Sequence, residues 1–155
     1  MAPHVVSIGD LVLDVILPVT LPVQPGGHQE SPERGIEPGG AANFMIAARR
    51  MGLGVSAAGA VGEDVFGALI LDGLRAEGVD TAFVVATPGS SSTLVIALTD
   101  RASGEHTFVG SYGTGPQVAY PDGLDACIAG ADAVFLQGYT LAEARIMPLA
   151  LRGLD

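Results

Sequence analysis

A glycine pair followed closely by an asparagine is the feature of this sequence with the clearest chemical use. Residues 36–52 read Ile-Glu-Pro-Gly-Gly-Ala-Ala-Asn-Phe-Met-Ile-Ala-Ala-Arg-Arg-Met-Gly. Glycine leaves the backbone amide open to a bound ligand, and the first turn of a helix adds N–H groups that have no partner inside the helix. We therefore expect a small polar ligand at Gly39, Gly40 and Asn43. The alternative is a tight turn before a packing helix, which needs the same glycines and no ligand.

Apolar residues that follow the glycine pair recur with the period of a helix, which predicts a helix over residues 41–51. Two arginines and then Gly52 mark its C-terminal end. The residues that set the period, and would form its apolar face, are Phe44, Ala47, Ala48 and Met51.

Short apolar runs on either side of this helix predict buried strands at residues 5–8 and 55–61. The order strand, helix, strand is typical of a parallel α/β sheet. Further along the chain we expect a helix over 64–76, a short helix over 122–128 and a buried strand over 133–136. The stretch from Leu141 begins as a helix, but Pro148 would break a long helix there.

Two segments, at about 12–36 and about 93–110, do not fit the alternating layout. The first is rich in proline and glycine, and in the second the strands 93–99 and 107–109 flank a polar turn. The strands 93–99 and 107–109, together with residues 83–86, look like strands joined by a hairpin. Such segments can form a small accessory sheet over the ends of the main strands, which predicts a lid. Long surface loops are the alternative.

Composition excludes several functional classes. The chain has 155 residues, the size of one domain, and a net charge of -10, which disfavours binding to nucleic acid or to anionic membranes. It contains no lysine, so neither a Walker A phosphate loop nor a lysine Schiff base is available within it. Its single cysteine, Cys127, cannot form an intrachain disulfide. The three histidines lack the spacing of metal ligands, so we expect no metal site.

No apolar stretch approaches the ~20 residues that a membrane span requires. The apolar run near the N-terminus does not fit a signal sequence, because it is interrupted by two prolines and lies next to or contains two aspartates. We therefore expect a cytoplasmic protein.

Four short motifs occur in one order along the chain: Val-Val-Ser-Ile-Gly-Asp-Leu-Val-Leu-Asp at 5–14, Pro-Gly-Gly-Ala-Ala-Asn at 38–43, Gly-Ala-Val-Gly-Glu-Asp-Val-Phe-Gly at 59–67 and Gly-Val-Asp at 78–80. Together they resemble the N-terminal half of the ribokinase-like (PfkB) carbohydrate kinases, from residue 5 to about 140. The resemblance implies an α/β fold in which helices flank a Rossmann-like parallel sheet and a small β-sheet forms a lid. Residues 1–155 would be the N-terminal part of one ribokinase-like domain, with the C-terminal half absent.

The resemblance also implies the substrate site. Asp14 matches the family's aspartate at the end of the first strand, which hydrogen-bonds substrate hydroxyls, and Gly39, Gly40 and Asn43 match its glycine pair and asparagine. Gln137 matches a later substrate-contacting position. A carboxylate can accept hydrogen bonds from two hydroxyls, and an amide can both donate and accept, so these residue types suit a sugar or a nucleoside. Asp14 could instead cap backbone amides.

The activity that the resemblance implies is transfer of a phosphoryl group from ATP, with Mg²⁺, to a sugar or nucleoside hydroxyl. The family's second signature, Asp-Thr-x-Gly-Ala-Gly-Asp, carries the catalytic base and an anion hole and is absent from these residues. We therefore expect no catalytic residue and no main ATP or Mg²⁺ site in this chain, and no turnover by the chain alone. A homodimer through the lid strands is also implied.

Two other functions remain open from the sequence. The chain could be a noncatalytic module that binds a sugar or nucleoside in the same pocket, or pairs with a partner through lid strands. A nicotinamide-binding Rossmann domain is less consistent with the sequence, because no Gly-x-Gly-x-x-Gly follows the first strand.

Overall fold

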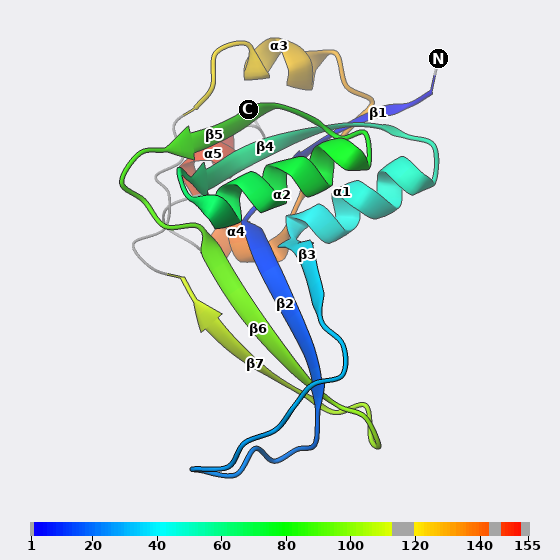
Figure 1. Cartoon of the computed structure of the whole chain (residues 1–155). Coiled ribbons are helices and arrows are strands. Elements are labelled where there is room, and N and C mark those ends of the chain that lie inside the picture. The colour runs from blue at the N-terminus through cyan, green and yellow to red at the C-terminus, as the bar shows by residue number, and fades with distance from the viewer. Residues whose placement is uncertain (1, 113–119, 143–146, 153–155) are drawn as a thin grey trace.

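Two sheets form the frame of the molecule. The computed structural model describes residues 2–112, 120–142 and 147–152. The first sheet has the strand order β5-β4-β1-β8, and the second has the order β3-β2-β6-β7. Figure 1 shows the second sheet extending away from the first sheet and its helices, which together form the body of the molecule. We call this second sheet the lid.

The helices and strands have these bounds: β1 His4–Ile8, β2 Leu11–Val19, β3 Gly35–Gly40, α1 Ala41–Arg50, β4 Gly54–Gly62, α2 Val65–Ala76, β5 Asp80–Thr87, β6 Thr93–Asp100, β7 His106–Ser111, α3 Leu124–Ala129, β8 Ala133–Leu136, α4 Gly138–Ala142 and α5 Met147–Arg152.

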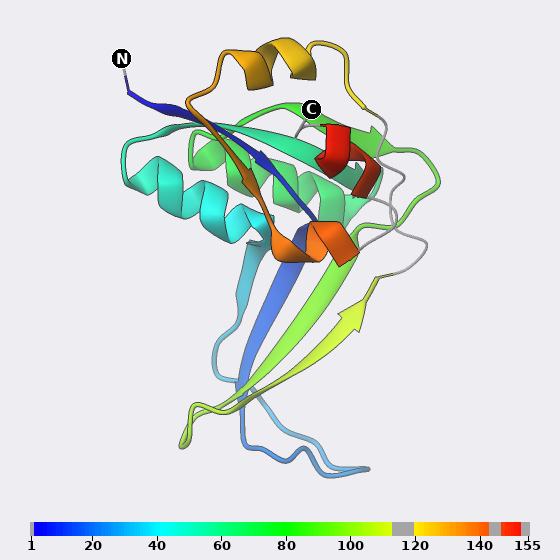
Figure 2. The same ribbon diagram turned by 180° about the vertical axis from the view of Figure 1, so that it is seen from behind.

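Helices cover both faces of the first sheet, in which all neighbouring strands are parallel. α1 and α2 lie on one face, and α3 and α5 lie on the other (Figures 1 and 2). One apolar cluster includes Met45 of α1 and Ile70 of α2, and a second includes Leu124 of α3 and Leu149 of α5. β4 is buried along nearly its whole length, as a parallel strand between two helical layers must be. The predicted α/β class is therefore confirmed.

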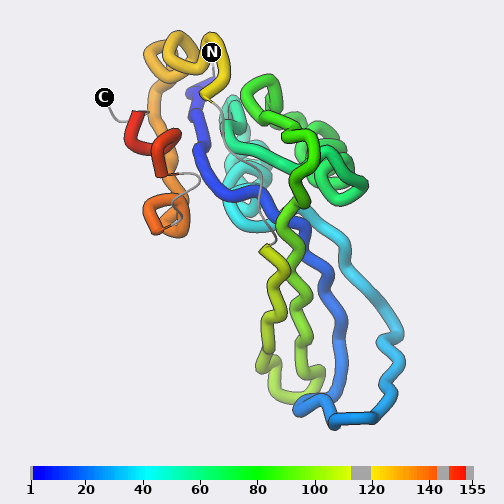
Figure 3. Tube along the Cα trace, turned by 90° about the vertical axis from the view of Figure 1, so that its left-hand side faces the viewer, coloured from blue at the N-terminus to red at the C-terminus, as the bar shows by residue number. Residues whose placement is uncertain are grey.

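The lid is built from the two segments that interrupt the alternating pattern. β2 continues the path of β1 after Gly9 and Asp10, and pairs with β3 on one side and β6 on the other. β6 and β7 form an antiparallel hairpin. In the side view of Figure 3 the lid strands run away from the body and their loops lie at the far end.

A hydrogen-bond network joins the lid to the body where β6 begins. The Asp64 carboxylate caps α2 by accepting from the Gly67 N–H at 2.8 Å, and it accepts from the backbone N and the Oγ of Ser92 at 2.8 and 2.7 Å. The Ser92 hydroxyl also accepts from the Gly62 N–H at 2.9 Å. Burial acts to raise the pKa of Asp64, but the hydrogen bonds from Gly67 and Ser92 outweigh it and hold the pKa below its ordinary value. The network fixes the start of β6 on the N-terminus of α2.

The predicted apolar face of α1 is wrong in part. The residues of α1 that are buried are Ala41, Ala42, Met45 and Ala48, whereas Met51 is 82% exposed. Phe44 is half-buried and stacks on Phe135 of β8, with ring centroids 3.7 Å apart. The buried stripe therefore runs through Ala41, Met45 and Ala48 rather than through Phe44, Ala47 and Met51.

One further prediction is corrected. Residues 83–86 belong to β5, which pairs with β4 in the first sheet, so they take no part in the lid hairpin. Pro148 is the second residue of α5, a position where the N–H that proline lacks is not needed. The predicted break of a longer helix from Leu141 stays a prediction, because residues 143–146 lie outside the described residues.

Within the described part of the chain, we find no helix that combines the length and the apolar character needed to cross a membrane.

Candidate functional site

A cavity of about 430 Å³ lies where the lid meets the body. Four of the five residues predicted from the sequence to bind substrate line it, namely Asp14, Gly40, Asn43 and Gln137. They come from β2, from the end of β3, from α1 and from the residue after β8. Segments far apart in the sequence therefore meet at one concave surface, the usual setting of a small-molecule site. Their role in binding stays a prediction.

Asp14 lies on the face of β2 that lines the cavity. It is half-buried, and no described residue donates a hydrogen bond to its carboxylate. Burial raises the pKa of Asp14, and the negative charge of Glu37, its cross-strand neighbour on β3, raises it further. A half-buried carboxylate without a protein partner is costly to the fold, and such groups are frequent at binding sites.

The structure gives the two glycines steric roles beside the predicted one in ligand binding, which stays a prediction. Both belong to the end of strand β3 rather than to a hinge. Gly39 is buried and does not line the cavity: a Cβ there would lie 2.0 Å from Oδ2 of Asp14, so its missing side chain makes room for the carboxylate.

Gly40 has a φ of 64°, and a Cβ there would lie 2.5 Å from the carbonyl oxygen of Asp10. That carbonyl accepts the N–H of Ala41, the first residue of α1, at 2.9 Å. Gly40 thus lets the first strand of the lid cross close to the N-terminus of the helix.

Asn43 and Gln137 supply amide groups to the cavity. Asn43 is an exposed residue in the first turn of α1, and its side-chain amide has no hydrogen-bond partner among the described residues. Gln137 accepts the N–H of Asp10 through Oε1 at 3.2 Å. Its NH₂ group remains a donor, so the cavity has a carboxylate acceptor and amide donors on its polar side.

Several cavity residues were not predicted from the sequence. They are Asp10, Val12, Val95, Phe108, Tyr112 and Tyr139. Asp10 and Val12 could have been found by the period of a strand, because residues 10, 12 and 14 point to the same face. Val95 is the direct partner of Asp14 on β6, but that register is set by long-range pairing and leaves no local signal.

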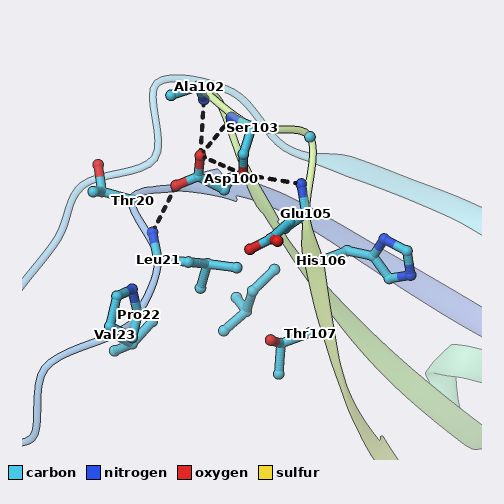
Figure 4. A pocket seen from close by; sticks show the side chains of 12 residues that line it. Thr20, Leu21, Pro22, Val23, Asp100, Ala102, Ser103, Glu105, His106 and Thr107 are labelled. Carbon is cyan, nitrogen blue, oxygen red and sulfur yellow. Dashed lines mark hydrogen bonds between the residues drawn. The ribbon is translucent and has the colours of Figure 1, made fainter.

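A larger hollow of about 1150 Å³ lies at the far end of the lid (Figure 4). The carboxylate at its centre, Asp100, already has protein partners: it accepts the N–H of Leu21 at 2.8 Å, that of Ala102 at 2.9 Å, and the N–H and hydroxyl of Ser103 at 2.8 and 3.0 Å (Figure 4). These hydrogen bonds lower the pKa of Asp100 to about 2. Asp100 therefore holds the lid loops together, and the cavity at the lid base is the better candidate site.

We predict that Glu37→Gln lowers the pKa of Asp14 without returning it to the ordinary value. The substitution removes the neighbouring charge, while burial, the larger cause, remains. A ¹³C NMR titration of the Asp14 carboxyl measures this directly, with Glu105→Gln at the far end of the lid as the control. An unchanged Asp14 pKa in Glu37→Gln would contradict the electrostatic account of this pair.

Residues 2–145 match the model of the "pfkB family carbohydrate kinase". A curated relative, fructokinase-1 of Oryza sativa subsp. japonica, is 38% identical over 106 residues, which cover 68% of this chain and 31% of the relative.

Among solved structures, a protein of Agrobacterium tumefaciens with a provisional ribokinase assignment is 30% identical with a TM-score of 0.82, over 99% of this chain and 48% of that one. A ribokinase of Arabidopsis thaliana complexed with ribose and ATP has a TM-score of 0.74 at 18% identity, over 99% of this chain and 51% of that one. The chain thus spans about a third of the curated relative's length and about half of each of these structures.

Proposed function

Because the chain belongs to the pfkB family of carbohydrate kinases, we propose that it supplies the substrate-binding part and the lid of an ATP-dependent kinase whose acceptor is a hydroxyl of a sugar or nucleoside. The observation that carries this proposal is the half-buried Asp14 carboxylate, which has no described protein partner and shares its cavity with Asn43 and Gln137. Two hydroxyls of a ligand would replace the water that the ionised carboxylate loses on burial.

Asp14 would accept hydrogen bonds from substrate hydroxyls, and the amides of Asn43 and Gln137 would orient the same ring. The lid face would cover the ligand and exclude water from it, which strengthens each of these hydrogen bonds. The substrate would thus be held with one hydroxyl presented for phosphorylation.

ATP as the phosphoryl donor is supported by the Arabidopsis thaliana ribokinase, whose structure contains ribose and ATP. The residues of this chain do not suit the triphosphate or Mg²⁺: it has no lysine, and no three His, Cys, Asp or Glu side chains are grouped as metal ligands within the described residues. We propose that the groups which hold ATP and Mg²⁺, and the base that accepts the hydroxyl proton, lie outside residues 1–155.

A turnover assay tests the proposal. The 155-residue chain, incubated with ATP, Mg²⁺ and ribose, fructose, adenosine or uridine, should form no phosphorylated product, because on this proposal the donor-binding groups and the base lie outside it. A longer chain that adds the sequence of the family's second half should turn over, and Asp14→Ala in that chain should abolish turnover. Steady formation of sugar phosphate by the homogeneous 155-residue chain would refute the division of roles. Sugar binding without turnover in the longer chain would establish a noncatalytic binding module instead.

We also propose that two copies of the chain associate through the lid face that points away from the cavity. This face carries Ile36 and Val109, which are 49% and 55% exposed, among half-buried aliphatic residues of β2 and β6. An apolar face of this kind can pair with its own copy about a twofold axis. Sedimentation velocity should show a dimer that Val109→Asp converts to a monomer. A monomer at all concentrations in the unchanged chain would contradict the proposal.

A further inference from the structure

Aromatic side chains gather at the candidate site. The chain has five phenylalanines, three tyrosines and no tryptophan, and Phe108, Tyr112 and Tyr139 all border the cavity at the lid base. Their exposed fractions are 63%, 53% and 73%. Large apolar groups left open around a concave polar site are typical of a surface that a ligand covers.

The register of the lid explains how the cavity becomes polar on one side and aromatic on the other. One row of residues across the lid runs from Glu37 through Asp14 and Val95 to Gly110, so the carboxylates stand on β3 and β2 and the apolar positions on β6 and β7. A Cβ at Gly110 would lie 2.6 Å from a ring carbon of Tyr112, so this glycine makes room for the tyrosine ring against the sheet.

Phe108 lies two residues before Gly110 on β7, so it is on the same face of the lid but further from the body. Its partner on β6 is Ala97, a small residue that leaves the phenyl ring uncovered. His106, two residues earlier on β7, contacts the Phe108 ring with the ring centroids 4.7 Å apart. The β6–β7 side of the cavity therefore presents two aromatic rings, Phe108 and Tyr112, beside Val95.

A free sugar does not match such a cavity well. It carries hydroxyls around its ring, and a hydroxyl that faces the Phe108 ring loses its water without gaining a hydrogen bond. A ligand with hydroxyls on one end and a flat apolar group on the other matches both sides, because aromatic side chains stack on planar bases.

We propose that this cavity selects a nucleoside over a free sugar: the ribose hydroxyls bind at Asp14 and Asn43, and the base stacks on Phe108 and Tyr112. The inference rests on the proposed function, since it names the acceptor of that same site. Phe108 and Tyr112 are then the residues that determine specificity, and Asp14 serves any hydroxylated ligand.

Isothermal titration calorimetry of the 155-residue chain with adenosine, uridine, ribose and fructose tests this inference. Stacking of one base on aromatic rings predicts nucleoside binding about tenfold tighter than ribose binding, or more. Phe108→Ala and Tyr112→Ala should each weaken nucleoside binding much more than ribose binding, and so remove most of this difference. Both rings are more than half exposed, so neither substitution threatens the fold. Phe66→Ala, on α2 outside the cavity lining, is the matched control and should leave the affinities for nucleosides and for ribose unchanged.

The outcomes separate this inference from the proposed function. If ribose or fructose binds as tightly as the nucleosides, or if Phe108→Ala and Tyr112→Ala do not weaken nucleoside binding selectively, the inference is wrong. If such a sugar still depends on Asp14, the proposed function stands without it. If none of the four ligands binds in an Asp14-dependent manner, both are overturned.

Discussion

Replacing Asp14 by asparagine should abolish ligand binding and at the same time stabilise the ligand-free protein. Two hydrogen bonds from hydroxyls to a carboxylate are worth about 1.5 to 3 kcal/mol each. Their loss should therefore lower the affinity at least about 100-fold. The gain in stability follows from the raised pKa of Asp14, because burial and the charge of Glu37 both disfavour its ionised form in the fold.

The sign of the pH dependence follows from the same shift. An acid with a higher pKa in the folded state than in the unfolded chain destabilises the fold when it is ionised. The wild-type protein should therefore gain stability as the pH falls through the raised pKa, and Asp14→Asn should lack this component. Ligand binding should change in the opposite direction, because protonation of Asp14 removes the acceptor that the hydroxyls need.

Thermal unfolding from pH 4 to pH 7, with and without uridine and ribose, measures both effects. Asp72→Asn is the matched control, since Asp72 is an exposed acid on α2 outside the cavity lining. An Asp14→Asn protein that binds with wild-type affinity would show that the carboxylate has no role in binding. A less stable Asp14→Asn protein would show that Asp14 serves the fold.

A single methyl group at Gly39 should have an effect on binding comparable to loss of the carboxylate itself. The added Cβ would lie 2.0 Å from Oδ2 and 2.4 Å from Cγ of Asp14, so either the carboxylate or strand β3 must move. Gly39→Ala should therefore lose ligand-induced stabilisation although every polar group of the cavity is still present. It should also lower the unfolding temperature of the ligand-free protein, because Gly39 is buried.

A double substitution identifies the cause. In the Asp14→Ala background the carboxylate is gone, so adding Gly39→Ala should cost little further stability. Gly35→Ala is the matched control on the same strand and the same lid face: its Cβ would lie 3.3 Å from Cβ of Ile16, a contact that a small shift relieves. Equal costs of Gly39→Ala with and without Asp14 would contradict the account of this contact.

Much of the fold could be predicted from local patterns. The strands at β1, β4 and β8 are short apolar runs, and α2 is bounded by Asp64 and by a glycine with positive φ, Gly78. The position of β5 could not be predicted, because its residues suit either sheet and only pairing with β4 decides between them. The buried face of α1 was misplaced because the helical period fits more than one row of apolar residues, and only packing against the sheet selects the row that contains Met45.

The candidate site could be predicted only in part. Resemblance to a family identified residue types at Asp14 and Asn43, and the structure places both at one cavity. The function of Gly39 could not be inferred, because it depends on the cross-strand approach of Asp14. The aromatic side of the cavity was missed for a related reason: Phe108 and Tyr112 face Asp14 only through the register of three lid strands, which no local pattern encodes.

The most direct test of the central claim is an NMR titration of the ¹⁵N-labelled chain with ribose and with uridine. We expect the side-chain amide signals of Asn43 and Gln137 to shift on addition of ligand, and the backbone signals of Leu21 and Ser103, at the far end of the lid, to stay in place. Shifts centred on the far end of the lid, or no shift with either ligand, would contradict the assignment of the site.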